Sequence, residues 1–215
     1  QSTNASTRLI RVLPPPDFTG STLSTFNINC GNSINLNGLA TSETMSTGPL
    51  SVSGSPVSLP DGSGVSYTTT LDFTGVFPVG ATVTPGCYPT VTFDLEHTYS
   101  GDLDIILISP TGQSVILYDQ HGGGIDFGLC ANPADDGVAG CPATYTVVST
   151  GGVAWTAAGV TTTAPANGTC SYTGVCEAGT NYISQTYNSS NPFTPFNGAD
   201  LNGVWTLQIT DNIGF

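Results

Sequence analysis

Residues 97–112 read HTYSGDLDIILISPTG, a polar turn that leads into an apolar strand and stops at a second turn. Ile105–Ile108 is apolar at every position, which is typical of a strand that is buried on both faces and is therefore central in its sheet. A second block, residues 197–212, reads NGADLNGVWTLQITDN and has the same order of turn, strand and turn. Its Trp205, Leu207 and Ile209 alternate with polar residues, so we expect these three to face the core.

Other segments show the same alternation. Apolar and polar residues alternate along Val65–Phe73 and again along Val91–His97, and a further short strand, Val115–Tyr118, follows the turn at Pro110–Gly112. No window of about 12 residues has a helical period. The sequence therefore predicts an all-β fold, a jelly-roll-like antiparallel β-sandwich.

The chain divides into parts of different composition. Pro14–Pro16 is typical of a stiff linker, and the alternation over residues 26–36 predicts a hairpin. We expect residues 1–48 to be a linker and a partial β unit of, or against, an adjacent domain, and residues 49–215 to form the sandwich. Residues 122–196 carry four cysteines and much Gly, Pro, Thr and Asn, so we expect an enlarged, disulfide-bonded loop region, where binding function tends to lie.

The charge is strongly one-sided. The net charge is -13, and the two basic residues are Arg8 and Arg11, so nothing after residue 11 carries a fixed positive charge. Nucleic acid and anionic membrane surfaces are therefore poor partners. No stretch approaches about 18 consecutive apolar residues, so we expect no membrane insertion. The polar start at Gln1 is typical of a mature or excised product.

Six cysteines fit an oxidising compartment, which predicts a secreted or cell-surface protein with structural disulfides. The six are Cys30, Cys87, Cys130, Cys141, Cys170 and Cys176. Nearest-neighbour pairing would join Cys130 to Cys141 and Cys170 to Cys176, and would leave Cys30 and Cys87 to staple the N-terminal segment to the sandwich. This is one of several possible schemes. A zinc site lacks support, because no C-x-x-C pair is present.

The two blocks, together with the turn at Leu59–Asp61, closely resemble the P/Homo B domain. This β-sandwich follows the catalytic domain of subtilisin-like proprotein convertases, and it also occurs in secreted bacterial proteases and surface proteins. The resemblance runs from Val57 to Phe215 and implies a non-catalytic module. In the family a further strand normally follows the second block. We therefore expect either that this chain is a piece lacking that final strand or that residues from its N-terminal segment fill the gap.

Catalytic readings are weaker than structural ones. A Ser-His-Asp hydrolase would need His97 or His121 as its base. We expect His97 to be buried and bonded to a neighbour such as Asp102, and residues 121–124 (HGGG) to form a flexible turn, since no G-x-S-x-G elbow is present. A glycosidase pair such as Asp94 and Glu96 is better read as a solvated strand face. The prediction is that the chain is not an enzyme.

Calcium is the cofactor that this surplus of carboxylates best suits, because it takes hard oxygen ligands from carboxylates, amides and carbonyls. The predicted ligands are Asp61, Asp102, Asp104 and Asp211. A second possibility is Asp126 with Asp135 and Asp136.

Three functions fit this sequence. The first is a structural or adhesive module of a secreted or cell-surface, bacterial, multidomain protein, with flanking domains and possibly other proteins or surface glycans as partners. The second is the C-terminal stabilising domain of a subtilisin-like or other secreted protease. The third is a carbohydrate-binding module that uses exposed aromatic residues. Its candidates are Tyr172, Tyr182, Tyr187 and Phe193.

Overall fold

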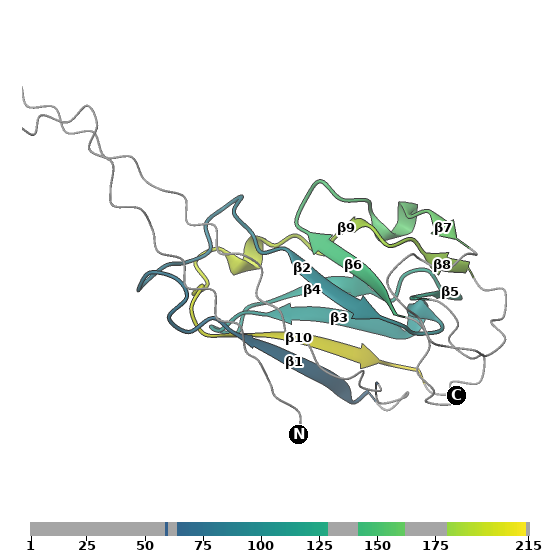
Figure 1. The fold of residues 1–215 in the computed structure, drawn as a ribbon, viewed down its shortest axis with the longest axis horizontal. Coiled ribbons are helices and arrows are strands. Elements are labelled where there is room, and N and C mark those ends of the chain that lie inside the picture. The colour runs from purple at the N-terminus through teal and green to yellow at the C-terminus, as the bar shows by residue number, and fades with distance from the viewer. Residues whose placement is uncertain (1–58, 60–63, 129–141, 162–179, 214–215) are drawn as a thin grey trace, which may run out of the picture. The chain divides into compact units, whose positions relative to one another are not determined.

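The computed structural model describes Leu59 and residues 64–128, 142–161 and 180–213, all within the unit Pro49–Phe215. These residues form ten β-strands and three short 3-10 turns (Figure 1). The strands are β1 Ser66–Asp72, β2 Val91–Leu95, β3 Leu103–Ile108, β4 Ser114–Asp119, β5 Ile125–Asp126, β6 Ala143–Val148, β7 Val160–Thr161, β8 Thr180–Tyr182, β9 Thr186–Asn188 and β10 Val204–Asp211. The 3-10 turns are η1 Ser100–Asp102, η2 Trp155–Ala157 and η3 Thr194–Phe196.

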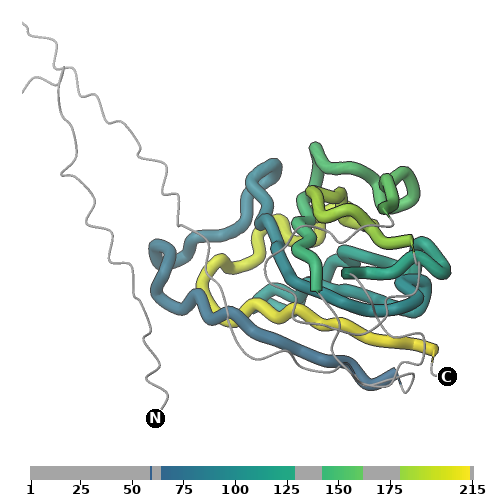
Figure 2. Tube along the Cα trace, turned by 45° about the vertical axis from the view of Figure 1, so that its right-hand side comes forward, coloured from purple at the N-terminus to yellow at the C-terminus, as the bar shows by residue number. Residues whose placement is uncertain are grey.

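One sheet has four strands in the order β1-β10-β3-β4, and all its pairs are antiparallel. The first and the last described strands of the chain therefore lie side by side (Figure 2). The prediction that Ile105–Ile108 forms a central strand is confirmed, because β3 lies between β10 and β4. A register shift between Ile105 and Ile106 marks a bulge in the β3–β4 pair.

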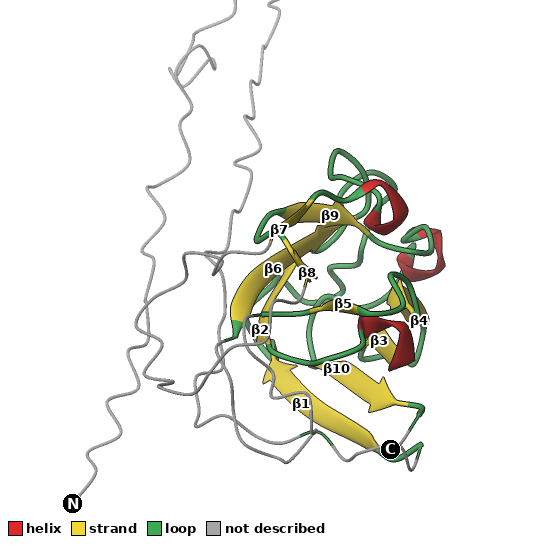
Figure 3. Ribbon diagram, turned by 90° about the vertical axis from the view of Figure 1, so that its right-hand side faces the viewer, coloured by secondary structure: helices red, strands yellow, loops and turns green. Residues whose placement is uncertain are grey.

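A second sheet has the order β2-β6-β9, and a third, smaller one has the order β5-β8-β7. Figure 3 shows the strands β2, β6 and β9 layered against the sheet that contains β1, β10 and β3. The β6–β9 and β5–β8 pairs are parallel, so the all-β sandwich is confirmed but is not antiparallel throughout.

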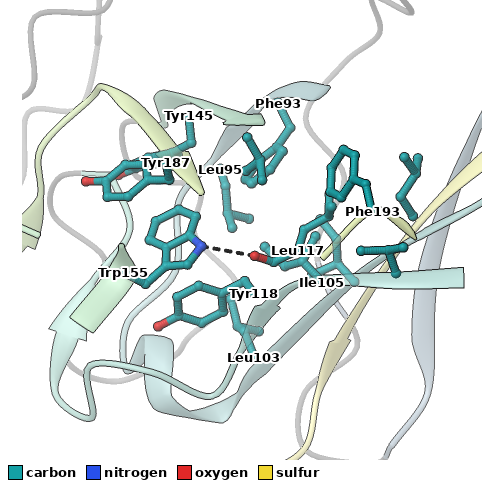
Figure 4. Packing of buried hydrophobic residues seen from close by; sticks show 14 of the residues in the cluster. Phe93, Leu95, Leu103, Ile105, Leu117, Tyr118, Tyr145, Trp155, Tyr187 and Phe193 are labelled. Atoms are coloured by element: carbon teal, nitrogen blue, oxygen red, sulfur yellow. Dashed lines mark hydrogen bonds between the residues drawn. The ribbon is translucent and has the colours of Figure 1, made fainter. Parts of the chain in front are cut away.

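The core lies between these layers. Leu103 and Ile105 are fully buried, and Trp205, which the alternation in its strand predicted to face the core, is 7% exposed. The opposite sheet contributes Phe93, Leu95 and Tyr145 to the same cluster. Figure 4 shows Leu103 and Ile105 of one sheet and Phe93, Leu95 and Tyr145 of the other in this cluster. Every second residue of a strand points to the same face, which accounts for this burial.

The expectation that residues 122–196 form a loop region is incomplete. This stretch supplies β6 and β9, two of the three strands of the second sheet. In β6, Ala143, Tyr145 and Val147 are buried and alternate with less buried threonine and valine, which is the ordinary two-residue period of a strand. The period is present in the sequence ATYTVV, but the surrounding glycines and prolines obscured it.

Candidate functional site

Two turns interlock at one end of the β3–β4 pair. Tyr99 has a left-handed backbone, with φ of 57°, and the Gly101 amide donates a 3.1 Å hydrogen bond to the carbonyl of Gly123. A Cβ atom on Gly101 would lie only 2.8 Å from the Cα of Gly123. Glycine is therefore required at position 101 because the two backbones approach too closely for any side chain.

The residues after His121 pack against the same turn. The buried Ser100 donates its hydroxyl to the His121 carbonyl at 3.0 Å, and the Tyr118 hydroxyl donates to that carbonyl as well. A Cβ on Gly122 would collide with the Tyr182 hydroxyl and with Ser100. The expected flexible turn at 121–124 is therefore a packed one, in which glycine gives room to neighbouring side chains.

His97 and Asp211 form a buried pair beside these turns. The His97 Nε2 atom lies 3.2 Å from an Asp211 carboxylate oxygen, and the two side chains are 11% and 3% exposed. The other Asp211 oxygen accepts a 3.1 Å hydrogen bond from the amide of Ile213. The backbone of His97 pairs with Phe127, although β2 itself ends at Leu95. The predicted buried histidine is thus confirmed, but its partner is Asp211 and not Asp102.

Two more carboxylates surround this pair. Burial raises the pKa of Asp102 above its usual value, the charge of Asp211 raises it further, and His97 partly offsets both effects. Burial also raises the pKa of Asp126, which is lowered in part by a hydrogen bond from the Tyr99 amide at 3.1 Å and by His97. His97 is thus a shared partner for three carboxylates that η1, β5 and β10 bring together.

Of the predicted calcium ligands, Asp102 lies close enough to Asp211 for the charge of Asp211 to add to burial in raising the Asp102 pKa, but Asp104 and Asp211 do not converge. Asp211 is opposite Leu103 in the β10–β3 ladder and Asp104 is opposite Thr210, so the two carboxylates point to opposite faces of the sheet. Asp104 accepts a 2.9 Å hydrogen bond from Asn212 on its own face. Across the described ranges, no three His, Cys, Asp or Glu side chains are placed to hold a metal ion. Asp61, Asp135 and Asp136 lie outside those ranges, and calcium stays a prediction.

The two histidines are held in structural contacts. His121 Nε2 is 3.1 Å from the Ser190 hydroxyl, which resembles the first half of a catalytic triad. Within the described part of the chain, the His121 ring donates no hydrogen bond to a carboxylate that would orient it. The Nδ1 atom of His97 is buried without a partner there, so His97 lacks a nucleophile as well. Neither pair has the three roles that hydrolysis by a triad needs.

The aromatic residues that were expected on the surface lie in the core. Tyr182, Tyr187 and Phe193 are fully buried, and Tyr172 lies outside the described residues. Burial raises the pKa of the Tyr187 hydroxyl to about 12. The expectation that these three form an exposed carbohydrate platform is wrong, because their ring faces are already covered by other core residues.

The cysteines are largely outside the described residues. Cys87 is exposed and has no disulfide partner within the described ranges. Cys30, Cys130, Cys141, Cys170 and Cys176 all lie in undescribed ranges. The disulfide scheme therefore stays a prediction.

The sequence suggested Asp102 as the partner of His97 and treated Asp126 and Asp211 as candidate calcium ligands, so it missed the His97–Asp211 contact. His97 and Asp211 are 114 positions apart, so no local pattern links them. One signal was available in the sequence. His97 begins the block 97–112 and Asp211 lies near the end of the block 197–212, and the antiparallel pairing of β3 with β10 brings these two ends together.

A comparison with protein families agrees with this geometry. Residues 89–128 match the family model described as the proprotein convertase P-domain, and this segment contains His97, both interlocked turns and strands β2 to β5. The P-domain is a non-catalytic accessory β domain. The segment is therefore P-domain-like, and the resemblance to the P/Homo B domain is confirmed there. No curated protein and no solved structure matches the chain.

The described residues include no helix with the length and apolarity to cross a membrane.

Proposed function

We propose that this chain contributes a non-catalytic β-sandwich module to a secreted or cell-surface multidomain protein, where its role is structural or adhesive. The observation that carries the proposal is the contact between His97, which lies in the P-domain-like segment 89–128, and Asp211 at the end of β10. In this segment His97 contacts Asp211 of β10, and His121 contacts Ser190, so both histidines take part in contacts that support the fold.

The surface chemistry supports an extracellular role. With no lysine and only two arginines, the chain offers few sites to trypsin-like proteases, and its net charge of -13 favours solubility. P-domains are typical of secreted proteases, which agrees with the cysteine content. Localisation outside the cell is part of the proposal.

A second candidate is favoured by the family match itself. P-domains accompany subtilisin-like proteases, so the module could stabilise a neighbouring protease domain in the same protein. In that case the sandwich would act as a folding partner, and the loss of the module would lower the amount of active protease.

Deletion of residues 49–215 from the protein in the cells that make it separates these roles. For a structural or adhesive module we expect weaker attachment of the cells to surfaces and unchanged secreted protease activity. For a protease-stabilising module we expect the reverse result. Proteinase K treatment of intact cells tests the localisation, since an intracellular module would survive it and contradict both candidates. A seven-residue deletion of β1 alone, which removes one edge strand, is the matched control for general misfolding.

A further inference from the structure

The loop between β1 and Val83 is held in one shape by the segment that precedes β10. Asn202 accepts a hydrogen bond from the Phe77 amide at 3.0 Å, and it donates to the carbonyls of Phe77 and Pro78 at 3.1 Å each. The Phe73 amide donates to the Gly203 carbonyl at 2.8 Å, so the loop is also fixed where it begins. Figures 1 and 2 show this loop lying beside the chain that leads into β10.

This fixed loop carries an apolar side chain into solvent. Val79 is fully exposed, and Pro78 before it is exposed as well. Beside them is a hollow of about 320 Å³, lined mainly by apolar atoms that include those of Phe77 and Ala81. We call this hollow and its rim the Val79 groove. Burial of such an apolar side chain against a partner lowers the free energy of the complex. Because the loop is already ordered, binding costs little conformational entropy.

One rim of the Val79 groove is acidic. Asp200 lines it, is exposed, and no described side chain forms an ion pair with it. The chain has no lysine or arginine after residue 11 that could neutralise it. The groove therefore fits an aliphatic side chain that stands next to a positive charge.

The chain contains one segment with this chemistry. Residues 8–13 read RLIRVL and combine both arginines of the protein with four aliphatic residues. We propose that the Val79 groove binds residues 8–13 of a second copy of this chain, so that copies associate through it. Leu9 or Ile10 would fill the apolar hollow, and Arg8 or Arg11 would approach the Asp200 carboxylate. This proposal goes beyond the structural module, which would stand if it failed.

The first test uses a labelled peptide of residues 7–13 and the full chain carrying R8S and R11S, so that the receiving chain has no competing segment. We expect the peptide to bind at low ionic strength, as measured by fluorescence anisotropy, and binding to weaken with added salt. Val79→Ser should weaken binding about 10-fold. Asp200→Asn should weaken it about 2- to 5-fold, as for an exposed ion pair.

Controls separate this site from general attraction to an acidic protein. Val160→Ser removes another exposed valine, distant in sequence on β7, and Asp119→Asn removes an exposed carboxylate on β4, so neither should change binding. A peptide with Leu9 and Ile10 changed to serine keeps both charges and should bind about 10-fold more weakly. If Asp119→Asn weakens binding as much as Asp200→Asn, or the serine peptide binds equally well, the proposal is overturned.

The second test measures association of the wild-type chain by sedimentation velocity over a range of concentrations. We expect a concentration-dependent shift to larger species that Val79→Ser or the R8S/R11S pair reduces. A wild-type chain that stays monomeric at every concentration overturns the proposal, even if the isolated peptide binds. Association that persists unchanged in the Val79→Ser chain also overturns it.

Discussion

Trp155 and Tyr187 stack face to face in the core, with ring centroids 3.7 Å apart and 4° between their planes. Trp155 also donates its indole N–H to the carbonyl of Leu117 at 3.0 Å, across to the β4 strand of the other sheet (Figure 4). Leu117 accepts from the Ser190 amide as well. A single side chain of η2 therefore joins the layer of β9 to the edge strand of the four-stranded sheet.

Replacement of Trp155 should destabilise the sandwich strongly. We expect Trp155→Ala to lower the free energy of unfolding by about 3–5 kcal/mol, because it leaves a cavity and removes one of the hydrogen bonds to the Leu117 carbonyl. Trp155→Phe keeps the stacking and loses the hydrogen bond, so its cost should be smaller. Urea unfolding followed by circular dichroism measures both. An alanine variant as stable as the wild type would contradict this account of the core.

The His97–Asp211 pair should show a coupling energy. His97→Gln and Asp211→Asn each remove one partner of a buried, charge-assisted hydrogen bond, and each should cost about 1.5–3 kcal/mol. The double variant should cost less than the sum of the single costs, by about 1 kcal/mol or more. Simple addition of the two costs would show that the contact contributes no specific stability.

Asp102 and Asp126 should make the folded chain less stable as the pH rises above 3.8, which is the ordinary pKa of an aspartate side chain. Both pKa values are raised in the folded chain, so the folded state favours the protonated acids. Their contribution is therefore complete below pH 3.8 and is lost as the pH passes the raised values. The double variant Asp102→Asn/Asp126→Asn should gain melting temperature relative to the wild type at pH 7 and match it near pH 3.5.

Asp72 provides a control of opposite sign for this pH effect. Hydrogen bonds from the Thr74 side chain and amide lower the pKa of Asp72. Asp72 therefore stabilises the fold at pH values above 3.8, the ordinary pKa of an aspartate, and this stabilisation disappears as the pH falls through the lowered pKa. Asp72→Asn should therefore lose melting temperature at pH 7 and not near pH 3. If both variants shift in the same direction, net charge and not local burial governs the pH dependence.

Calcium is tested by removal and addition. If Asp61 or the acidic residues of the undescribed ranges complete a site, EDTA should lower the melting temperature at low ionic strength. A site held at 100 times its dissociation constant contributes about 2.7 kcal/mol. Magnesium at the same concentration controls for general screening of the acidic surface. An unchanged melting temperature after EDTA would rule out a stabilising calcium site.

The sequence predicted the strands whose alternation is strong and local. Ile105–Ile108, Trp205 and the Val91–Leu95 strand lie in the sheets as expected, because a two-residue period specifies a buried face without knowledge of partners. The β6 strand has the same two-residue period but was missed, because the many glycines and prolines around it suggested a loop region. The parallel β6–β9 pair depends on long-range packing, and no local signal reports it.

The site was less predictable than the fold. The sequence identified His97 as a buried histidine, but the choice between Asp102 and Asp211 depends on the β10–β3 register. The same register places Asp104 and Asp211 on opposite faces of the sheet, which the sequence of the two turns alone could not reveal. Burial of Tyr182 and Tyr187 follows from η2 folding over them, and their polar, glycine-rich surroundings suggested exposure instead.

The interlocked turns offer the sharpest test of the P-domain-like segment. Gly101→Ala would place a Cβ 2.8 Å from the Cα of Gly123, so one backbone must move. We expect a loss of about 1–3 kcal/mol in the free energy of unfolding, as for other overpacked sites. Gly124→Ala is the matched control in the partner turn, because its Cβ would meet only the Tyr99 ring at an ordinary 4.0 Å. Urea unfolding of both variants decides the point: equal stability would mean that the turns separate readily and that Gly101 is not required for their packing.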